Sequence, residues 1–394
     1  MKRILALLLL ACLLCGCAGA GETDTTVPTT AAAEPTTEPT TEPTTVPTEP
    51  PVVHRNPLNG EILEEPFTGR IWAHTITNTP DALPHVGVNQ ADLFFECYVS
   101  RGVVRCLAMY TDLSDVEAIG ATRSTRLLFN QFVHAYDAIF THGGGFPMVL
   151  QDANGRQLDH FNVDSLYRQG DPLMKATAYR DKVYKRQAPN NLFGYGPGIV
   201  EYVESLGVRT TQPADKEYYL NFVEDGTPAN GEVAEEIIIE FGDDLKTTTM
   251  VYDETLGKYV YNQYGQVMRD QITDEVEAFN NVIVMQADMY ENYVYQEANF
   301  HVGGWGYYAC GGKLIPIKWT CPDSPAPFRF FTEDGEPLQI NTGNTYIAVL
   351  SFLNEVKWQE ATPPETEPVE TVAETAAETT VETTAETIPV TTAG

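Results

Sequence analysis

The sequence predicts an α+β protein in which an N-terminal mixed α/β domain is followed by a smaller, mostly antiparallel β domain. In the first part of the folded region, apolar residues recur with helical spacing in some segments and alternate in others. In the second part, short strands are separated by Gly, Asp and Asn turns. The pattern changes in the segment EDGTPANGE, so we place the domains at residues 56–228 and 229–356.

Strands and helices alternate in the first domain. The helix at 124–137 has Leu127, Leu128, Phe132 and Ala135 on one face, with Ser124 or Thr125 available as N-cap. Proline near the first turn marks two further helix starts. The expected elements are a strand at 70–77, a hairpin at 93–110, the helix at 124–137, a strand at 138–142, a helix from Pro147 and a helix at 197–207.

The second domain is predicted to contain strands with no long helix between them. Its segments are rich in β-branched and aromatic residues and are bounded by turn residues. The expected strands lie within 235–242, 247–265, 280–288, 299–319, 328–340 and 345–352.

The ends of the chain predict export and a lipid anchor. Residues 1–17 have two basic residues, an apolar run too short to span a bilayer, and then small residues, as in a secretory signal. The end of this segment, LCGC, resembles the lipobox of bacterial lipoproteins, with Cys17 as the acylated residue. We therefore expect a protein at the cell membrane, facing the extracytoplasmic side and held there by its N-terminal lipid.

Two flanking segments, 18–55 and 357–394, are rich in Pro, Thr and Glu and are predicted to be disordered. Residues 18–53 and 361–394 of these segments contain 13 acidic residues and no basic ones, and the signal contains two basic ones, so the remaining body has 42 acidic and 22 basic residues. This excess of negative charge excludes nucleic acid as a partner. Any anion site must therefore be local.

The predicted hairpin contains two cysteines. With a two-residue turn at Arg101-Gly102, outward counting places Cys97 opposite Cys106 at a non-hydrogen-bonded pair. A disulfide between them would suit an oxidising exterior. The alternative is two free, buried thiols.

Several segments, in this order, resemble those of the YerB-like lipoproteins, whose two domains have no assigned function. The resemblance implies a two-domain lipoprotein and covers nearly all of the folded body. The segments that carry it are NPLNG, NTPDALP, ADLFFE, GATRSTR, YDAIFTHGGGFP, YRD and PNNL in the first domain, and NNVIVMQAD, GWGYYACGGKLIPIKW and GNTYIAVL in the second.

A candidate binding site is suggested by GATRSTR, which places two arginines just before a helix. Cations there oppose the helix dipole, so something must offset them. One alternative is an internal carboxylate, from Glu96, Asp92, Asp137, Asp152 or Asp181; the other is a bound anion, such as a wall-derived ligand or an acidic group of an envelope protein. The predicted ligand-binding residues are Arg123, Ser124, Arg126, His142, Gly143, Gly144, Arg180 and Asn191.

Two other functions stay open at this point. A hydrolase could use His142 and Asp159 as acid and base, which requires their side chains to approach within about 3 Å or through one water. A structural adaptor would have no pocket. The spacing of the histidines matches no metal motif, and we expect neither a metal nor a cofactor.

Overall fold

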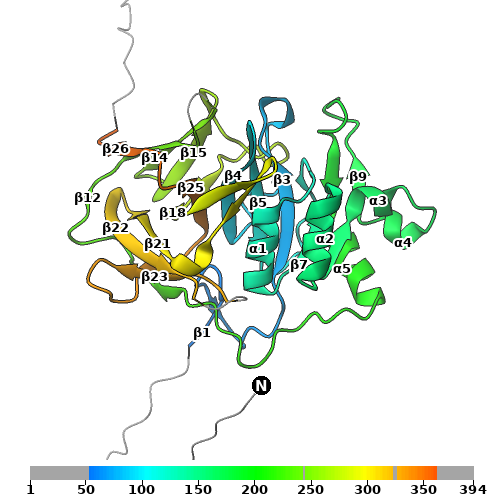
Figure 1. Ribbon diagram of the computed structural model, residues 1–394, viewed down its shortest axis with the longest axis horizontal. Helices are drawn as coiled ribbons and strands as arrows, with labels where there is room; N and C mark the ends of the chain where they lie inside the picture. The colour runs from blue at the N-terminus through cyan, green and yellow to red at the C-terminus, as the bar shows by residue number, and fades with distance from the viewer. Residues whose placement is uncertain (1–52, 243–244, 323–325, 362–394) are drawn as a thin grey trace, which may run out of the picture. The chain divides into compact units, whose positions relative to one another are not determined.

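The computed structural model describes residues 53–242, 245–322 and 326–361 of the chain. The signal, the predicted acylation site Cys17, most of the first flanking segment and the tail from residue 362 lie outside this part. The described residues belong to one compact unit, shown in Figure 1.

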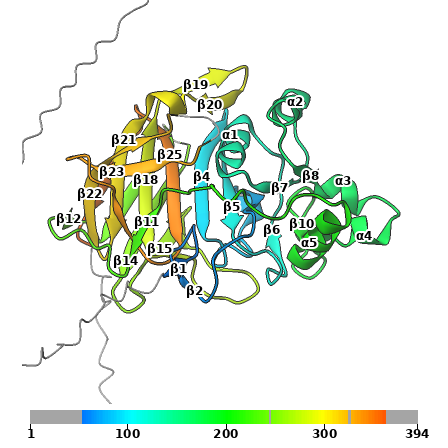
Figure 2. The same ribbon diagram turned by 90° about the horizontal axis from the view of Figure 1, so that it is seen from below.

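A thirteen-stranded sheet takes strands from both halves of the sequence (Figure 2). Strand β25, from the second half, pairs in parallel with β4 of the first half and with β18 of the second. The two halves therefore share one sheet. In spatial order the strands are β12 (Glu232–Val233), β22 (Lys313–Thr320), β21 (Gly304–Cys310), β18 (Asn281–Ala287), β25 (Thr345–Ser351), β4 (Leu93–Ser100), β5 (Val103–Tyr110), β3 (Trp72–Thr77), β7 (Ile139–His142) and β8 (His160–Asn162), with β19 (Met289–Asn292), β20 (Tyr295–Ala298) and β23 (Arg329–Thr332) off this path.

A six-stranded sheet packs on one face of the long sheet. Met250 and Tyr261 from this second sheet share a buried apolar cluster with Phe94 and Tyr346 of the long sheet. Its strands are β16 (Gln266–Val267), β15 (Lys258–Gln263), β14 (Thr247–Asp253), β13 (Glu236–Glu240), β26 (Val356–Gln359) and β17 (Ala278–Phe279). There are also three small sheets in the described residues. The first contains β6 (Ile119–Gly120), β10 (Leu192–Gly194) and β9 (Ala178–Arg180) in this order. The second pairs β1 (His54–Arg55) with β2 (Ile62–Leu63), and the third pairs β11 (Asn221–Val223) with β24 (Gln339–Asn341).

The opposite face of the long sheet is covered by helix α1. Phe132 of this helix stacks on Phe95 of β4 with ring centroids 4.6 Å apart. Burying such side chains is the main source of stability for this layer, at about 25 cal/mol per Å² of apolar surface. The helices are α1 (Leu127–Tyr136), α2 (Pro147–Gly155), α3 (Val163–Tyr167), α4 (Pro172–Lys175) and α5 (Gly196–Ser205), with short 3₁₀ turns at Pro80–Ala82 and Phe300–Val302.

The mixed fold class is confirmed, and β structure predominates. The boundaries differ at three places. The N-cap of α1 is Arg126, without a side-chain cap, because the Thr125 hydroxyl bonds to the Asn130 side chain instead. Strand β1 begins before the expected start at residue 56, and β26 extends beyond 356 into the segment predicted to be a tail.

The predicted disulfide between Cys97 and Cys106 is wrong. A register shift between Tyr98 and Ser100 places Cys97 opposite Arg105, and Cys106 opposite Glu96. The two thiols are free and lie in the apolar clusters on opposite faces of the sheet. Adding one residue to one strand reverses the side to which every following side chain points.

Candidate functional site

Two loops meet at the start of two helices. The RSTR segment leads into α1, and the glycine turn after β7 leads into α2. Gly143 N–H donates to Arg123 O at 2.8 Å, and Thr125 N–H donates to Gly144 O at 2.9 Å. The Ser124 hydroxyl also reaches Gly143 O, at 3.4 Å. The two loops that the sequence singled out are thus joined directly.

This corner is electropositive before any ligand is considered. Neither α1 nor α2 has an acidic residue in its first turn, and neither has a side-chain cap. The exposed N–H groups at a helix start act as a partial positive charge, equivalent to about half an elementary charge. Anions are therefore favoured where the two loops join.

Arg105 and Arg126 add two guanidinium groups that share one backbone acceptor. Arg105 Nη1 donates to Ser124 O at 2.6 Å, and Arg126 Nη1 approaches the same oxygen at 3.4 Å. Within the described residues, neither has a carboxylate partner, and the Nε of each is buried without an acceptor. Burial, with the charges of Arg126 and Arg123, lowers the pKa of Arg105 well below its usual range. The cluster lacks a counter-charge.

Arg123 lines a cavity of about 390 Å³. Its side chain has neither a hydrogen-bond acceptor nor a carboxylate partner in the described part of the chain, and its Nε is buried. Burial lowers the pKa of Arg123. The lining residues are Thr122, Arg123, Gly143, Asp164, Arg168, Arg180, Ala188, Pro189 and Leu192.

Arg180 enters the same cavity but is already engaged. Its Nη2 contacts Asp164 Oδ1 at 2.5 Å, and its Nη1 donates to the Asn191 side chain at 2.7 Å. Arg168 takes the other oxygen of Asp164 at 2.6 Å. Arg180 is therefore held rigidly, and Asn191 acts through it without lining the cavity.

The structure places the predicted arginines, serine and glycines in three different positions. Arg123, Gly143 and Arg180 face the cavity. Arg126 turns away from it towards Tyr295, with its guanidinium 5.4 Å from the ring centroid. Ser124 and Gly144 lie where the loops join.

The internal carboxylates proposed as partners for the two arginines all bind elsewhere. Asp137 pairs with Arg70 and Arg209, and Asp152 pairs with Arg156. Glu96 pairs with Lys246, and Asp92 accepts hydrogen bonds from Asn59 and Thr111. Asp181 accepts from the backbone N–H groups of Val183 and Tyr184. The structural ion pair expected as one alternative is therefore not formed.

His142 supports the glycine turn and does not line the cavity. It is fully buried; its Nδ1 accepts from Gly144 N–H at 3.1 Å, and its Nε2 lies 3.0 Å from His160 Nδ1. Burial lowers the pKa of His142 to about 3. Asp159 instead pairs with Arg70, 2.5 Å away. The acid/base pair of the hydrolase alternative is therefore absent.

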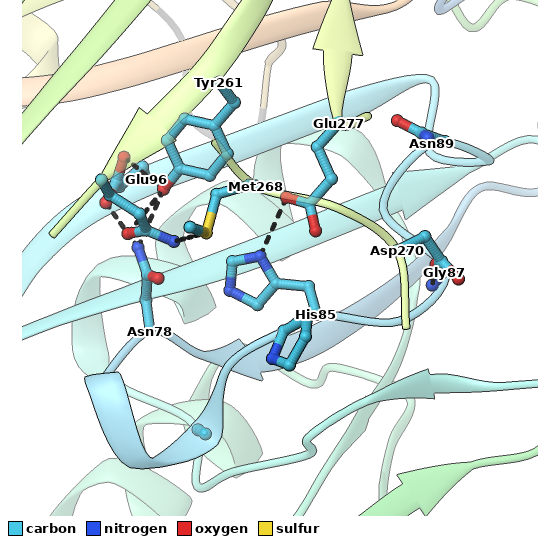
Figure 3. A network of polar contacts seen from close by, with 12 residues as sticks. Asn78, His85, Gly87, Asn89, Glu96, Tyr261, Met268, Asp270 and Glu277 are labelled. Atoms are coloured by element: carbon cyan, nitrogen blue, oxygen red, sulfur yellow. Dashed lines mark hydrogen bonds and ion pairs between the residues drawn. The ribbon is translucent and has the colours of Figure 1, made fainter. Parts of the chain in front are cut away.

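A separate buried network joins the two sheets (Figure 3). Glu96, on β4, is fully buried and forms an ion pair with Lys246. Asn78, Tyr261 and Tyr346 donate to its carboxylate at 2.5, 3.0 and 2.6 Å, and the Thr248 hydroxyl donates at 2.9 Å. These contacts satisfy a carboxylate that would otherwise be costly to bury.

His85 and Glu277 form a second buried pair beside this network (Figure 3). Their Nδ1 and Oε2 atoms are 3.0 Å apart, and both side chains are fully enclosed. Sequence reasoning did not identify either residue, because they are 192 positions apart and no local pattern marks them. Their burial indicates a structural role between the two halves.

Two further properties concern the described residues only. Their helices are all too short or too polar to pass through a bilayer. No group of three or more His, Cys, Asp or Glu side chains in this part of the chain is arranged to hold a metal ion.

Comparison with known proteins identifies both halves of the body. Residues 58–209 match the N-terminal domain of the protein family of unknown function DUF3048, and residues 237–347 match its C-terminal domain. The chain is also similar to the crystal structure of the YerB protein from Bacillus subtilis, with a TM-score of 0.64 and 20% identity over 77% of this chain and 99% of that one. At this identity the likeness concerns the fold alone. No curated protein matches the chain.

Proposed function

The chain belongs to the DUF3048 family, whose function is unknown, and we propose that it is an extracytoplasmic binding protein of the cell envelope. In this proposal a lipid on Cys17 holds it at the membrane, and the cavity beside Arg123 binds a small anionic ligand or the acidic terminus of a partner protein. The residues 18–52 would separate the folded body from the lipid.

One observation carries the binding proposal. Arg123 lines a cavity of about 390 Å³ with no acidic partner among the described residues, although the protein has a large excess of acidic residues. Leaving a partly buried guanidinium unpaired costs free energy, whereas a planar guanidinium binds a carboxylate or phosphate through two hydrogen bonds. A ligand that supplies such oxygens would remove this cost.

Isothermal titration calorimetry of the mature full-length chain tests the binding proposal. The probes are muropeptides, which carry carboxylates, and inorganic phosphate. We expect the wild type and Arg101→Ala to bind the probes with the same affinity. Arg123→Ala should bind at least about tenfold more weakly, because it loses a charge-assisted hydrogen bond that contributes about 1.5 kcal/mol or more. Arg101 is a matched control because it is exposed and pairs with Glu291. Equal heats from wild type and Arg123→Ala would contradict the proposed role of this cavity, and no heat from either protein would favour an adaptor without a ligand.

The anchor is tested separately by fractionation of cells. We expect the wild type in the membrane fraction and Cys17→Ser outside it, because one lipid-bearing residue is the proposed attachment. Equal membrane association of the two proteins would exclude Cys17 as the anchor. This result would leave the cavity proposal untouched.

A further inference from the structure

We propose that the ligand of this cavity carries a phosphate monoester, that is, a group with two negative charges. The inference rests on the proposed function, because it specifies the class of anion that the same cavity would hold. A carboxylate or a phosphate diester, each with one negative charge, is the competing class.

The first argument is the charge of the cavity wall. Arg123, Arg168 and Arg180 line it together with a single carboxylate, that of Asp164. Three cations and one anion leave two positive charges to be neutralised. A monoester carries between 1.5 and 2 negative charges near neutral pH, so it matches this excess, whereas a carboxylate or a diester leaves one positive charge over.

The second argument is the charge behind the wall. Arg105 is only 3% exposed, its Nε has no partner, and the structure gives it no carboxylate within the described residues. Arg126 approaches the same carbonyl oxygen, and the starts of α1 and α2 adjoin it. The attraction of these fixed charges for a ligand grows with the charge of the ligand, so the corner favours a dianion over a monoanion.

The third argument is the distribution of donors and apolar surface. Arg180 is fixed by Asp164 and Asn191, whereas the guanidinium fork of Arg123 has no acceptor among the residues that the structure describes. The fork can bind two phosphate oxygens at once. Ala188, Pro189 and Leu192 form an apolar part of the same wall. They would contact the organic part of the ester.

The test compares three probes at pH 7.5 by isothermal titration calorimetry on the mature full-length chain. Glycerol 3-phosphate is the monoester, glycerophosphorylglycerol is the matched diester, and acetate is the carboxylate. We expect the monoester to bind at least about tenfold more tightly than either monoanion. Its affinity should fall by at least about tenfold in Arg123→Ala and stay unchanged in Arg101→Ala.

A second variant separates charge from structure. In Arg126→Met one positive charge is removed behind the wall. Because the electrostatic energy doubles for a dianion, the fold-loss for the monoester should be the square of the fold-loss for acetate or the diester. A purely structural disturbance of the loop would weaken all three probes by the same factor. Circular dichroism would be used to check that each variant is folded.

The outcomes distinguish this inference from the proposed function. Equal or tighter binding of acetate or the diester overturns the monoester assignment but leaves an anion-binding protein. Equal fold-losses for all probes in Arg126→Met also contradict it. If none of the three probes nor a muropeptide binds, both proposals fail.

Discussion

Replacing Lys246 by methionine should destabilise the protein strongly. Lys246 is 6% exposed and is the cation among the side chains that contact the carboxylate of Glu96. Burial lowers the pKa of Lys246, and Glu96 opposes this shift. Removing one partner of a buried ion pair leaves the other charge uncompensated, which costs about 3 to 5 kcal/mol. With an unfolding entropy of about 2.1 cal/mol/K per residue over roughly 300 residues, we expect the melting temperature to fall by about 5 to 8 °C.

Urea denaturation followed by circular dichroism measures this loss. Lys357→Met is the matched control, because Lys357 is 51% exposed and pairs with Glu240 at 3.0 Å and with Glu355 at 2.9 Å. An exposed ion pair is screened by solvent and contributes little to stability, so this variant should remain close to wild type.

A double variant tests the cause. Glu96→Gln together with Lys246→Met removes both charges and keeps the shape of the carboxyl group. We expect it to be more stable than Lys246→Met alone, since no uncompensated charge remains buried. The reasoning is refuted if Lys246→Met costs no more than Lys357→Met, or if the double variant shows the sum of the two single losses.

Three further predictions concern other parts of the fold. Burial holds the pKa of His142 near 3, below its unfolded value of about 6.5. Between these values the unfolded chain takes up a proton that the folded chain does not, so the free energy of unfolding decreases as the pH falls. Denaturant titrations at pH 6.5 and 4.5 should therefore show wild type losing about 2 kcal/mol more than His142→Asn. Cys97 and Cys106 should react with iodoacetamide only after the protein is unfolded, because both thiols are free and buried. Mass spectrometry without a reductant measures this reaction, and thiols that stay unreactive after unfolding would indicate a disulfide. Gly306→Ala should lower the melting temperature by several degrees, because a Cβ there would overlap a carbonyl oxygen of β18. A Cβ at Gly155 would contact no other atom, so the melting temperature of Gly155→Ala should equal or exceed that of wild type. Equal melting temperatures for the two variants would contradict this prediction.

The local elements could be predicted from the sequence, but the hairpin register could not. Two nearly continuous apolar runs predict β4 and β5 correctly, since apolar side chains occupy both faces of a buried strand. The bulge near Ser100 lies where Tyr295 of β20 pairs with this residue and where Val294 O accepts from Arg101 N–H. This partner strand is distant in the sequence, so no local turn rule could place the bulge.

The candidate site could be predicted in part. The RSTR segment and the glycine turn stand out because cations at a helix start oppose the helix dipole and a glycine turn there can expose N–H groups to an anion, and the structure joins the two segments. Arg105 was missed because it lies inside β5, away from the two loops that the sequence singled out. The only available signal was a charged residue in a strand that is otherwise apolar. The partners of Glu96 were also out of reach, since Lys246 is 150 residues away.

The position of β25 between β4 and β18 also constrains the order of folding. Glu96 and Tyr346, which contact each other across β4 and β25, are 250 residues apart in the chain. Until β25 is available, β4 and β18 each present a bare edge that invites pairing with other chains. The sheet therefore closes late, and a chain emerging in an unfolded state must be kept from aggregating until almost all of its described part is available. A fragment ending between the halves would stay in this vulnerable condition.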